Sequence, residues 1–223
     1  FKNKIITLNQ LLKSRTDKKY CLNLCLGGAV AANNHGFVES LIRLGANNIE
    51  RGLEECCVHG HYELAKKFIN YGAKNFNQGL YGACYCNHYN LVNLMIAKGA
   101  TNFDKVLIMA AGCHNIEMIK TMLYYGATAV NSAMTCASSN GYIDGVNLLL
   151  KHGANNFDDC LLSACYKGDL DMAELMISLG ATNFNDGFTT ACVHEQYDMM
   201  QLMFDKGATH CRQCEMAASL HAL

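Results

Sequence analysis

The chain has 223 residues, of which 51% are hydrophobic, and its formal net charge is −1. This composition suits one folded domain or one continuous repeat array, and the near-zero charge argues against a general nucleic-acid binder. The sequence has no run of 18 or more apolar residues and no signal-peptide pattern. We therefore expect an intracellular, cytoplasmic protein that neither spans a membrane nor binds nucleic acid.

Residues 1–17 are the first predicted element, an N-terminal capping segment with a helix around residues 5–12. Residues 1–19 contain six basic side chains against Asp17 alone, a charge of +5, so the remainder of the chain carries −6. A basic arm that contacts a partner and a solvated end cap both fit this asymmetry, and the end cap is the favoured interpretation.

Seven Gly-Ala pairs follow, each 27 residues after the last. The Gly of each pair is position 0 of a repeat unit, and repeat positions are counted from it below. A fixed period of this length indicates stacked supersecondary units, a solenoid. The pairs begin at Gly45, Gly72, Gly99, Gly126, Gly153, Gly180 and Gly207. The sequence thus predicts seven repeats over residues 18–206 (18–44, 45–71, 72–98, 99–125, 126–152, 153–179 and 180–206), the first degenerate, and a partial capping repeat over 207–223.

Each unit contains two predicted helices. In the first, position 4 is apolar and position 5 is usually Asn or Asp, which we expect to cap the helix, with Glu50 as the exception. Small or apolar residues at positions 8, 11 and 12 form its buried stripe. A turn follows, with glycine at position 15 in Gly60, Gly141 and Gly168.

The second predicted helix starts near position 17. Acidic residues favour position 18, where the helix dipole stabilises them, and positions 19, 20, 23 and 24 are apolar and expected in the core. The Gly at position 0 is expected to end this helix in a left-handed conformation. One such helix pair cannot bury its apolar faces alone, so the units must stack.

One unit carries a recognisable order of motifs: the small pair Ala164–Cys165, then Gly168, the pair Met176–Ile177, and Gly180–Ala181. This order resembles that of the ankyrin repeat, and Gly60–His61 supplies the Gly-His of that family. The resemblance covers residues 18–223 and implies an all-α, ankyrin-like helix-turn-helix solenoid. Ankyrin units run to about 33 residues. The residues missing here fall in the segment that forms the family's β-hairpin, so we expect trimmed hairpin loops.

The shortened unit resembles a narrower group as well. The segment Gly-Ala-Thr-Asn-Phe-Asp at residues 99–104 is similar to ankyrin-like proteins of large DNA viruses of amoebae and of some protists. For a viral protein, this resemblance implies a place in the host cytoplasm or the virion.

Thirteen cysteines allow three interpretations. Reduced thiols serving as small core hydrophobes are favoured, because Cys recurs at the buried position 12. A zinc site at Cys211–Cys214 with His210, or at Cys84–Cys86 with His88, lacks a second ligand pair at finger-like spacing. Redox or disulfide chemistry is the third possibility.

No catalytic pattern is present. Cys192 and His194 lie two residues apart on one short helix and so face different directions. The glycines punctuate helices and form no phosphate-binding loop. We therefore predict no enzyme, no catalytic residues, no cofactor and no metal.

The resemblance implies that partners bind along the concave side, on the first helices, where positions 9 and 13 form the exposed ridge. The predicted partner-binding residues are Tyr81, Tyr85, Ile108, Leu162 and Tyr166, because exposed aromatics are favoured interface anchors. The alternative is that position 9 packs against the adjacent unit.

The predicted function is a non-enzymatic protein–protein interaction scaffold. The alternative is a structural or virion-associated component that self-assembles end to end, through an apolar face that includes Met216, Leu220 and Leu223.

Overall fold

The computed structural model describes residues 18–209, and within this range it contains helices joined by short connections and no strand. First and second helices alternate along the chain, two to each 27-residue unit. The bounds are α2 (Lys18–Ala31), α3 (His35–Arg43), α4 (Ile49–His59), α5 (Tyr62–Asn70), α6 (Phe76–Tyr85), α7 (Tyr89–Ala97), α8 (Phe103–Gly112), α9 (Ile116–Tyr124), α10 (Val130–Ser139), α11 (Ile143–Lys151), α12 (Phe157–Lys167), α13 (Leu170–Ser178), α14 (Phe184–Val193) and α15 (Tyr197–Asp205). The predicted N-terminal cap, residues 1–17, and residues 210–223 of the predicted C-terminal cap at 207–223 lie outside the described residues.

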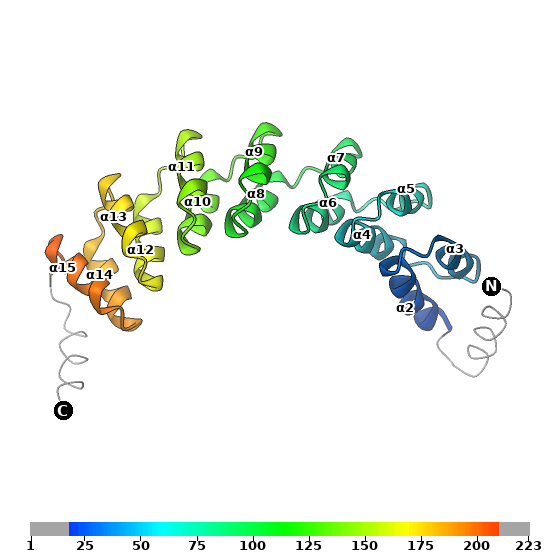
Figure 1. Cartoon of the computed structure of the whole chain (residues 1–223), viewed down its shortest axis with the longest axis horizontal. Helices are drawn as coiled ribbons and strands as arrows, with labels where there is room; N and C mark the ends of the chain where they lie inside the picture. Colours follow the sequence, from blue (N-terminus) through cyan, green and yellow to red (C-terminus); the bar gives the residue numbers. More distant parts are fainter. Residues whose placement is uncertain (1–17, 210–223) are drawn as a thin grey trace, which may run out of the picture. The chain divides into compact units, whose positions relative to one another are not determined.

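The chain divides into two compact units, residues 1–102 and 103–223. In the N-terminal unit the first helices α2, α4 and α6 pack one against the next, and each second helix lies against the first helix of its own repeat. In the C-terminal unit α8, α10, α12 and α14 form the same kind of row, with α9, α11, α13 and α15 beside it (Figure 1). The predicted fold class, an all-α repeat solenoid, is confirmed.

The core follows the predicted stripes. Leu53, Cys56 and Cys57, at positions 8, 11 and 12, are fully buried, and so are Leu64 and Phe68 of the second helix. Position 24 was expected in the core, but it is only half-buried from Ile42 onward and exposed at Phe204. Neighbouring second helices contact each other much less than neighbouring first helices do, so this side of the second helix stays partly open.

The Gly-Ala pairs end the second helices as predicted. Every Gly at position 0 has a positive φ, between +90° and +109°. In the turn after α5, Ala73 N–H donates to Phe68 O at 3.1 Å and Gly72 N–H donates to Ile69 O at 3.0 Å. These two bonds define the Schellman ending, in which a left-handed residue lets the chain satisfy the last carbonyls of a helix. The Ala that follows each Gly is buried.

The first helices end in the same way at position 15, where φ is again positive. There φ lies between +50° and +78°, and only Gly60, Gly141 and Gly168 are glycines. Asn33, Asn87, His114 and Glu195 occupy this position in the other repeats. The helix pairs therefore have two kinds of end. The Gly-Ala edge consists of the connections between repeats, from position 26 of one unit to position 3 of the next. The turn edge consists of positions 13 to 18 within a unit.

The predicted role of position 5 was wrong. From α4 onward the first helices begin at position 4, so the N-cap residue is at position 3, as in Asn75, whose side chain accepts from Gln78 N–H. The position-5 side chain lies inside the first turn and reaches the following repeat instead. Asn77 Oδ1 accepts from Thr101 N–H at 2.7 Å and from Asn102 N–H at 3.0 Å.

This bond from one repeat to the next recurs through the described residues and forms an amide ladder along the Gly-Ala edge. Its acceptors are Asn23, Glu50, Asn77, Asp104, Asn131, Asp158 and Asn185. Glu50, the apparent exception in the sequence, does the same with a longer side chain, accepting from Asn75 N–H at 2.8 Å. Without a hairpin, these connections obtain through the ladder the hydrogen bonds that strand pairing would supply.

Candidate interaction surface

The predicted ridge begins on α6 in the N-terminal unit. Tyr81 and Tyr85 lie four residues apart, so they share one face of this helix. Tyr81 is half-buried, whereas 63% of Tyr85 is exposed. Position 13 thus presents an aromatic ring to solvent, and position 9 supplies a partly covered side chain one turn earlier.

The other three predicted residues lie in the C-terminal unit. Ile108 on α8 and Leu162 on α12 are half-buried, and Tyr166 on α12 is 51% exposed. The structure does not join them into one apolar strip. Helix α10 packs between α8 and α12, and its residues at positions 9 and 13 are Thr135 and Ser139. Leu162 and Tyr166 therefore form one group and Ile108 stands apart from it.

Tyr166 does not stand alone on α12. Its ring packs edge-on against the His194 ring at the end of α14, with centroids 4.2 Å apart, and Lys167 Nζ lies 5.7 Å from the Tyr166 centroid. A Cβ atom at Gly168 would collide with the side-chain amide of Gln196. The turn after α12 and the turn after α14 are therefore in direct contact.

The sequence interpretation missed a second set of exposed apolar residues on the turn edge. All but one lie at position 17, the first residue of the second helix. The other, Val193, lies at position 13 of α14, a position that the sequence placed on the exposed ridge. Position 17 lies on the same helical stripe as positions 20 and 24, so its apolar pattern is indistinguishable in sequence from a core signal. The exposed members are Tyr89, Ile143, Leu170, Val193 and Tyr197.

The eleven cysteines among the described residues are all free thiols. Burial raises the pKa of Cys57, Cys84 and Cys165 to about 12, so these thiols stay protonated at neutral pH. Protonated, buried thiols behave as small hydrophobic side chains rather than as nucleophiles or metal ligands.

Within residues 18–209 no cluster of three His, Cys, Asp or Glu side chains is arranged to hold a metal ion. His88 of the Cys84–His88 candidate is engaged elsewhere, with Nε2 3.1 Å from Val58 O. The candidate with His210, Cys211 and Cys214 lies outside the described residues. His194, the possible partner of Cys192, packs its ring on Tyr166.

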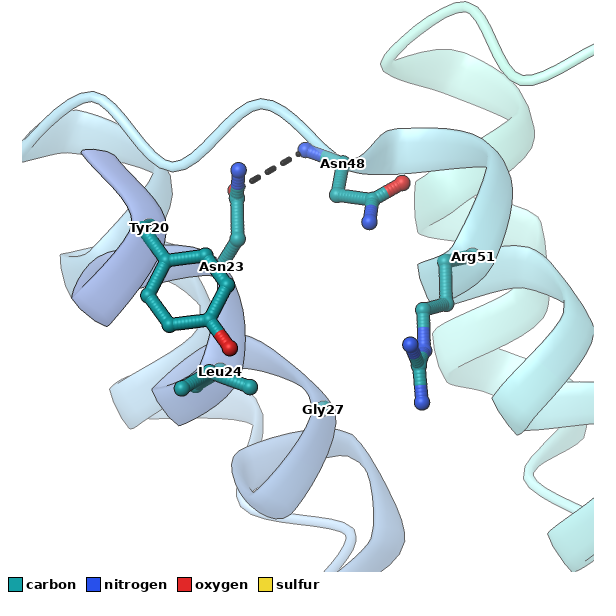
Figure 2. A pocket seen from close by; sticks show the side chains of 6 residues that line it. All are labelled: Tyr20, Asn23, Leu24, Gly27, Asn48 and Arg51. Carbon is teal, nitrogen blue, oxygen red and sulfur yellow. Dashed lines mark hydrogen bonds between the residues drawn. The ribbon is translucent and has the colours of Figure 1, made fainter.

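A small cavity lies between α2 and α4 in the N-terminal unit (Figure 2). Its volume is about 170 Å³, below the roughly 300 Å³ at which ligand pockets begin. Asn23 crosses its upper edge, where it accepts from Asn48 N–H at 3.1 Å as part of the amide ladder. The lining residues are Tyr20, Asn23, Leu24, Gly27, Asn48 and Arg51. We interpret it as the space left by the Gly27 face of α2 rather than as a small-molecule site.

None of the described helices is both long enough and apolar enough to cross a membrane.

The comparisons with known proteins agree with this architecture. Residues 80–159 match the family model for ankyrin repeats, in three copies. This segment carries ankyrin repeats. The structure is similar to the crystal structure of the human ASB11 ankyrin repeat domain, with a TM-score of 0.62 and 20% sequence identity over 83% of this chain and 99% of that chain. No curated protein matches the sequence.

Ankyrin repeats are in general protein–protein interaction modules. Repeats of this class place their variable side chains on a rigid, preformed stack of helices. The large hydrophobic side chains that the turn edge exposes are Tyr85, Tyr89, Ile143, Tyr166, Leu170, Val193 and Tyr197.

Proposed function

We propose that the chain is an intracellular, non-enzymatic ankyrin scaffold that binds a partner protein through side chains on its first helices. The observation that carries the proposal is the exposure of large aromatic side chains, Tyr85 and Tyr166, at position 13 of helices whose opposite faces are fully buried. Free thiols in the described core support a reducing, intracellular environment.

The physical basis of binding is a surface formed before the partner arrives. A tyrosine has two side-chain torsions and a large apolar ring, so it contributes contact area at little cost in side-chain entropy. Half-buried Tyr81 and Leu162 lie one helical turn before Tyr85 and Tyr166 and extend the apolar surface. Each first helix is held by its neighbours, which limits the reorganisation that binding would require.

The experiment compares two tyrosine variants of the whole chain. The partner is first isolated by affinity capture from the native cell and identified by mass spectrometry. The Tyr85→Ala/Tyr166→Ala variant should then bind at least about tenfold more weakly, since interface aromatics contribute about 1–2 kcal/mol or more each. Tyr124→Ala is the matched control, because Tyr124 on second helix α9 is the more exposed, at 85%.

Both variants should melt within a few degrees of the wild type, because exposed side chains contribute little to stability. Unchanged capture by the double variant, or an equal loss with Tyr124→Ala, would remove this ridge as the binding site.

A second candidate function, end-to-end self-assembly, is favoured by the charge of the two units. Residues 1–102 hold 12 basic and 6 acidic side chains, and residues 103–223 hold 6 basic and 13 acidic ones, giving charges of +6 and −7. Units of opposite charge attract head to tail, and such heterologous contacts can propagate into chains. Light scattering at low salt should then show mass rising with concentration; monomers throughout would contradict assembly.

A further inference from the structure

The turns that follow α12 and α14 form one surface, which we call the paired turns and define as residues 166–171 and 193–198. Two contacts join them: the Tyr166 ring packs edge-on against the His194 ring, and the Gln196 side chain covers Gly168. Because α12 and α14 also pack along their lengths, the position of one turn relative to the other is set by the helix stack.

Each of the two turns exposes two large apolar side chains. Val193 is 71% exposed, Tyr197 62% and Leu170 37%, and Tyr166 joins them. Single exposed hydrophobic residues are ordinary on protein surfaces, but a cluster that draws on adjoining turns is typical of a contact site.

The paired turns also contain exposed acidic side chains. Asp171, Glu195 and Asp198 are exposed, and no residue of the described range forms an ion pair with them. Asp169 caps α13 by accepting from Met172 N–H at 3.1 Å. The paired turns contain one lysine, Lys167, which lies over the Tyr166 ring. Their formal charge is therefore clearly negative.

The fold does not require these carboxylates. The corresponding turn of the N-terminal unit, residues 85–90, also exposes two tyrosines, Tyr85 and Tyr89, yet contains no acidic residue. Asn87 and Asn90 stand there at the positions of Glu195 and Asp198. The same backbone thus forms with neutral side chains. The N-terminal turn at residues 58–63 has one carboxylate, Glu63, and this one pairs with Lys66 at 3.3 Å, whereas the exposed carboxylates of the paired turns form no such pair within the described residues.

We propose that the paired turns bind a basic segment of a partner protein that also carries an aromatic or aliphatic side chain. Lysine or arginine side chains of the segment would face Asp171, Glu195 and Asp198, and its apolar side chain would lie among Tyr166, Leu170 and Tyr197. The tyrosine faces also attract cations, as Lys167 over Tyr166 shows. This inference rests on the proposed scaffold function and specifies the chemistry of the partner.

The test selects binders from a random peptide display library with the whole chain as bait. Peptides that bind should carry net positive charge and at least one aromatic or aliphatic residue. Their affinity, measured by fluorescence anisotropy, should fall about tenfold or more between 50 and 300 mM salt, because added salt screens exposed charges.

Two variants with equal changes in net charge locate the site. The first, Asp171→Asn/Glu195→Gln/Asp198→Asn, neutralises the paired turns and should weaken binding at least about tenfold at low salt. The second, Asp159→Asn/Glu174→Gln/Asp186→Asn, neutralises three exposed acids elsewhere on the same repeats and should leave affinity within about twofold. Tyr166→Ala/Tyr197→Ala should weaken binding by at least about tenfold at both salt concentrations.

Any of the following results would overturn the inference: selection of no peptides, selection of acidic or neutral peptides, an equal effect of both charge variants, or dimers in light scattering that the paired-turn variants abolish. The last result would assign the surface to a second copy of the chain. Peptides that bind but lose affinity only on Tyr85→Ala would also overturn it, while leaving the scaffold function intact.

Discussion

The Gly-Ala edge and the turn edge both end their helices with a left-handed residue, but they differ in which residues they accept at that position. At the Gly-Ala edge all seven left-handed residues are glycines, whereas at the turn edge glycine shares the position with Asn, His and Glu. Large exposed apolar side chains and unpaired carboxylates gather on the turn edge of α12 to α15. The residue that ends the helix is therefore fixed as glycine at the Gly-Ala edge and variable at the turn edge.

The backbone angles explain the difference. At the Gly-Ala edge φ lies between +90° and +109°, beyond the left-handed region that other residues enter. Steric crowding is not the cause, because a Cβ atom added to any of these glycines would meet nothing within 4 Å. At the turn edge φ stays between +50° and +78°, inside the region that Asn and, at some cost, other residues adopt.

The largest expected effect comes from the same substitution at both edges. Gly126→Asn forces a side chain onto φ of +93° and should lower the free energy of unfolding by about 2 kcal/mol. Gly141→Asn, at φ of +67°, should cost less, about 1 kcal/mol, because Asn tolerates the left-handed region and the one close neighbour of its Cβ, Asp169 Oδ2 at 3.1 Å, belongs to a side chain that can shift. Urea denaturation measures both. Equal costs at the two sites would show that φ does not set the glycine requirement.

The next largest expected effect on stability comes from removing one acceptor of the amide ladder. Asn77→Ala removes the acceptor for Thr101 and Asn102 N–H and should destabilise the protein by about 1 kcal/mol, since exposed hydrogen bonds are worth about that much. Asn90→Ala, an exposed Asn of α7 outside the ladder, is the control and should be neutral. If the two variants unfold at the same urea concentration, the ladder contributes nothing to stability.

Glu195 is the least favourable residue at a turn-edge position, with φ of +56°. Glu195→Gly relieves this strain and should raise the free energy of unfolding by up to about 1 kcal/mol. The same change removes a carboxylate from the paired turns, so basic peptides should bind more weakly. A variant that is more stable and binds less well would show that this residue serves binding at a cost in stability.

The smallest effect is a pH dependence within the ladder. Hydrogen bonds from Ala129 and Thr128 N–H lower the pKa of Asp104 below its usual value. A lowered pKa stabilises the fold above the unfolded value of about 4 and loses that contribution as pH falls through the folded value. Asp104→Asn should retain the bonds without titrating, so the variant should gain stability relative to wild type below about pH 4. A constant difference between pH 7 and 3 would contradict this.

The sequence predicted the period, the helix pairs and the ankyrin-like class because each depends on local chemistry. Glycine at position 0 and the small pair at positions 11 and 12 report backbone angle and close helix packing within one repeat. Position 5 was misread for the opposite reason. Its Asn or Asp has the composition of a helix cap, and nothing within one repeat reveals that its acceptor oxygen meets the following connection.

The candidate surface could be predicted only in part. Spacing four residues apart identified the ridge of Tyr81 and Tyr85, and likewise that of Leu162 and Tyr166, because such residues share a helical face. The exposure of Leu170 and Tyr197 could not be predicted, because an apolar residue at the start of a helix fits the same sequence pattern whether it is buried or exposed. The contact between the turns after α12 and α14 also has no signature in either turn alone.

The sequence by itself determined the helix pairs, where the helices end and which glycines end them, because those properties depend on local backbone preference and on periodicity within 27 residues. The tertiary structure alone decided which side chains of one repeat meet the next. Stacking set the amide ladder, the partial exposure of position 24 and the pairing of the two acidic turns, since each arises from the distance and orientation between neighbouring repeats, which no single repeat encodes.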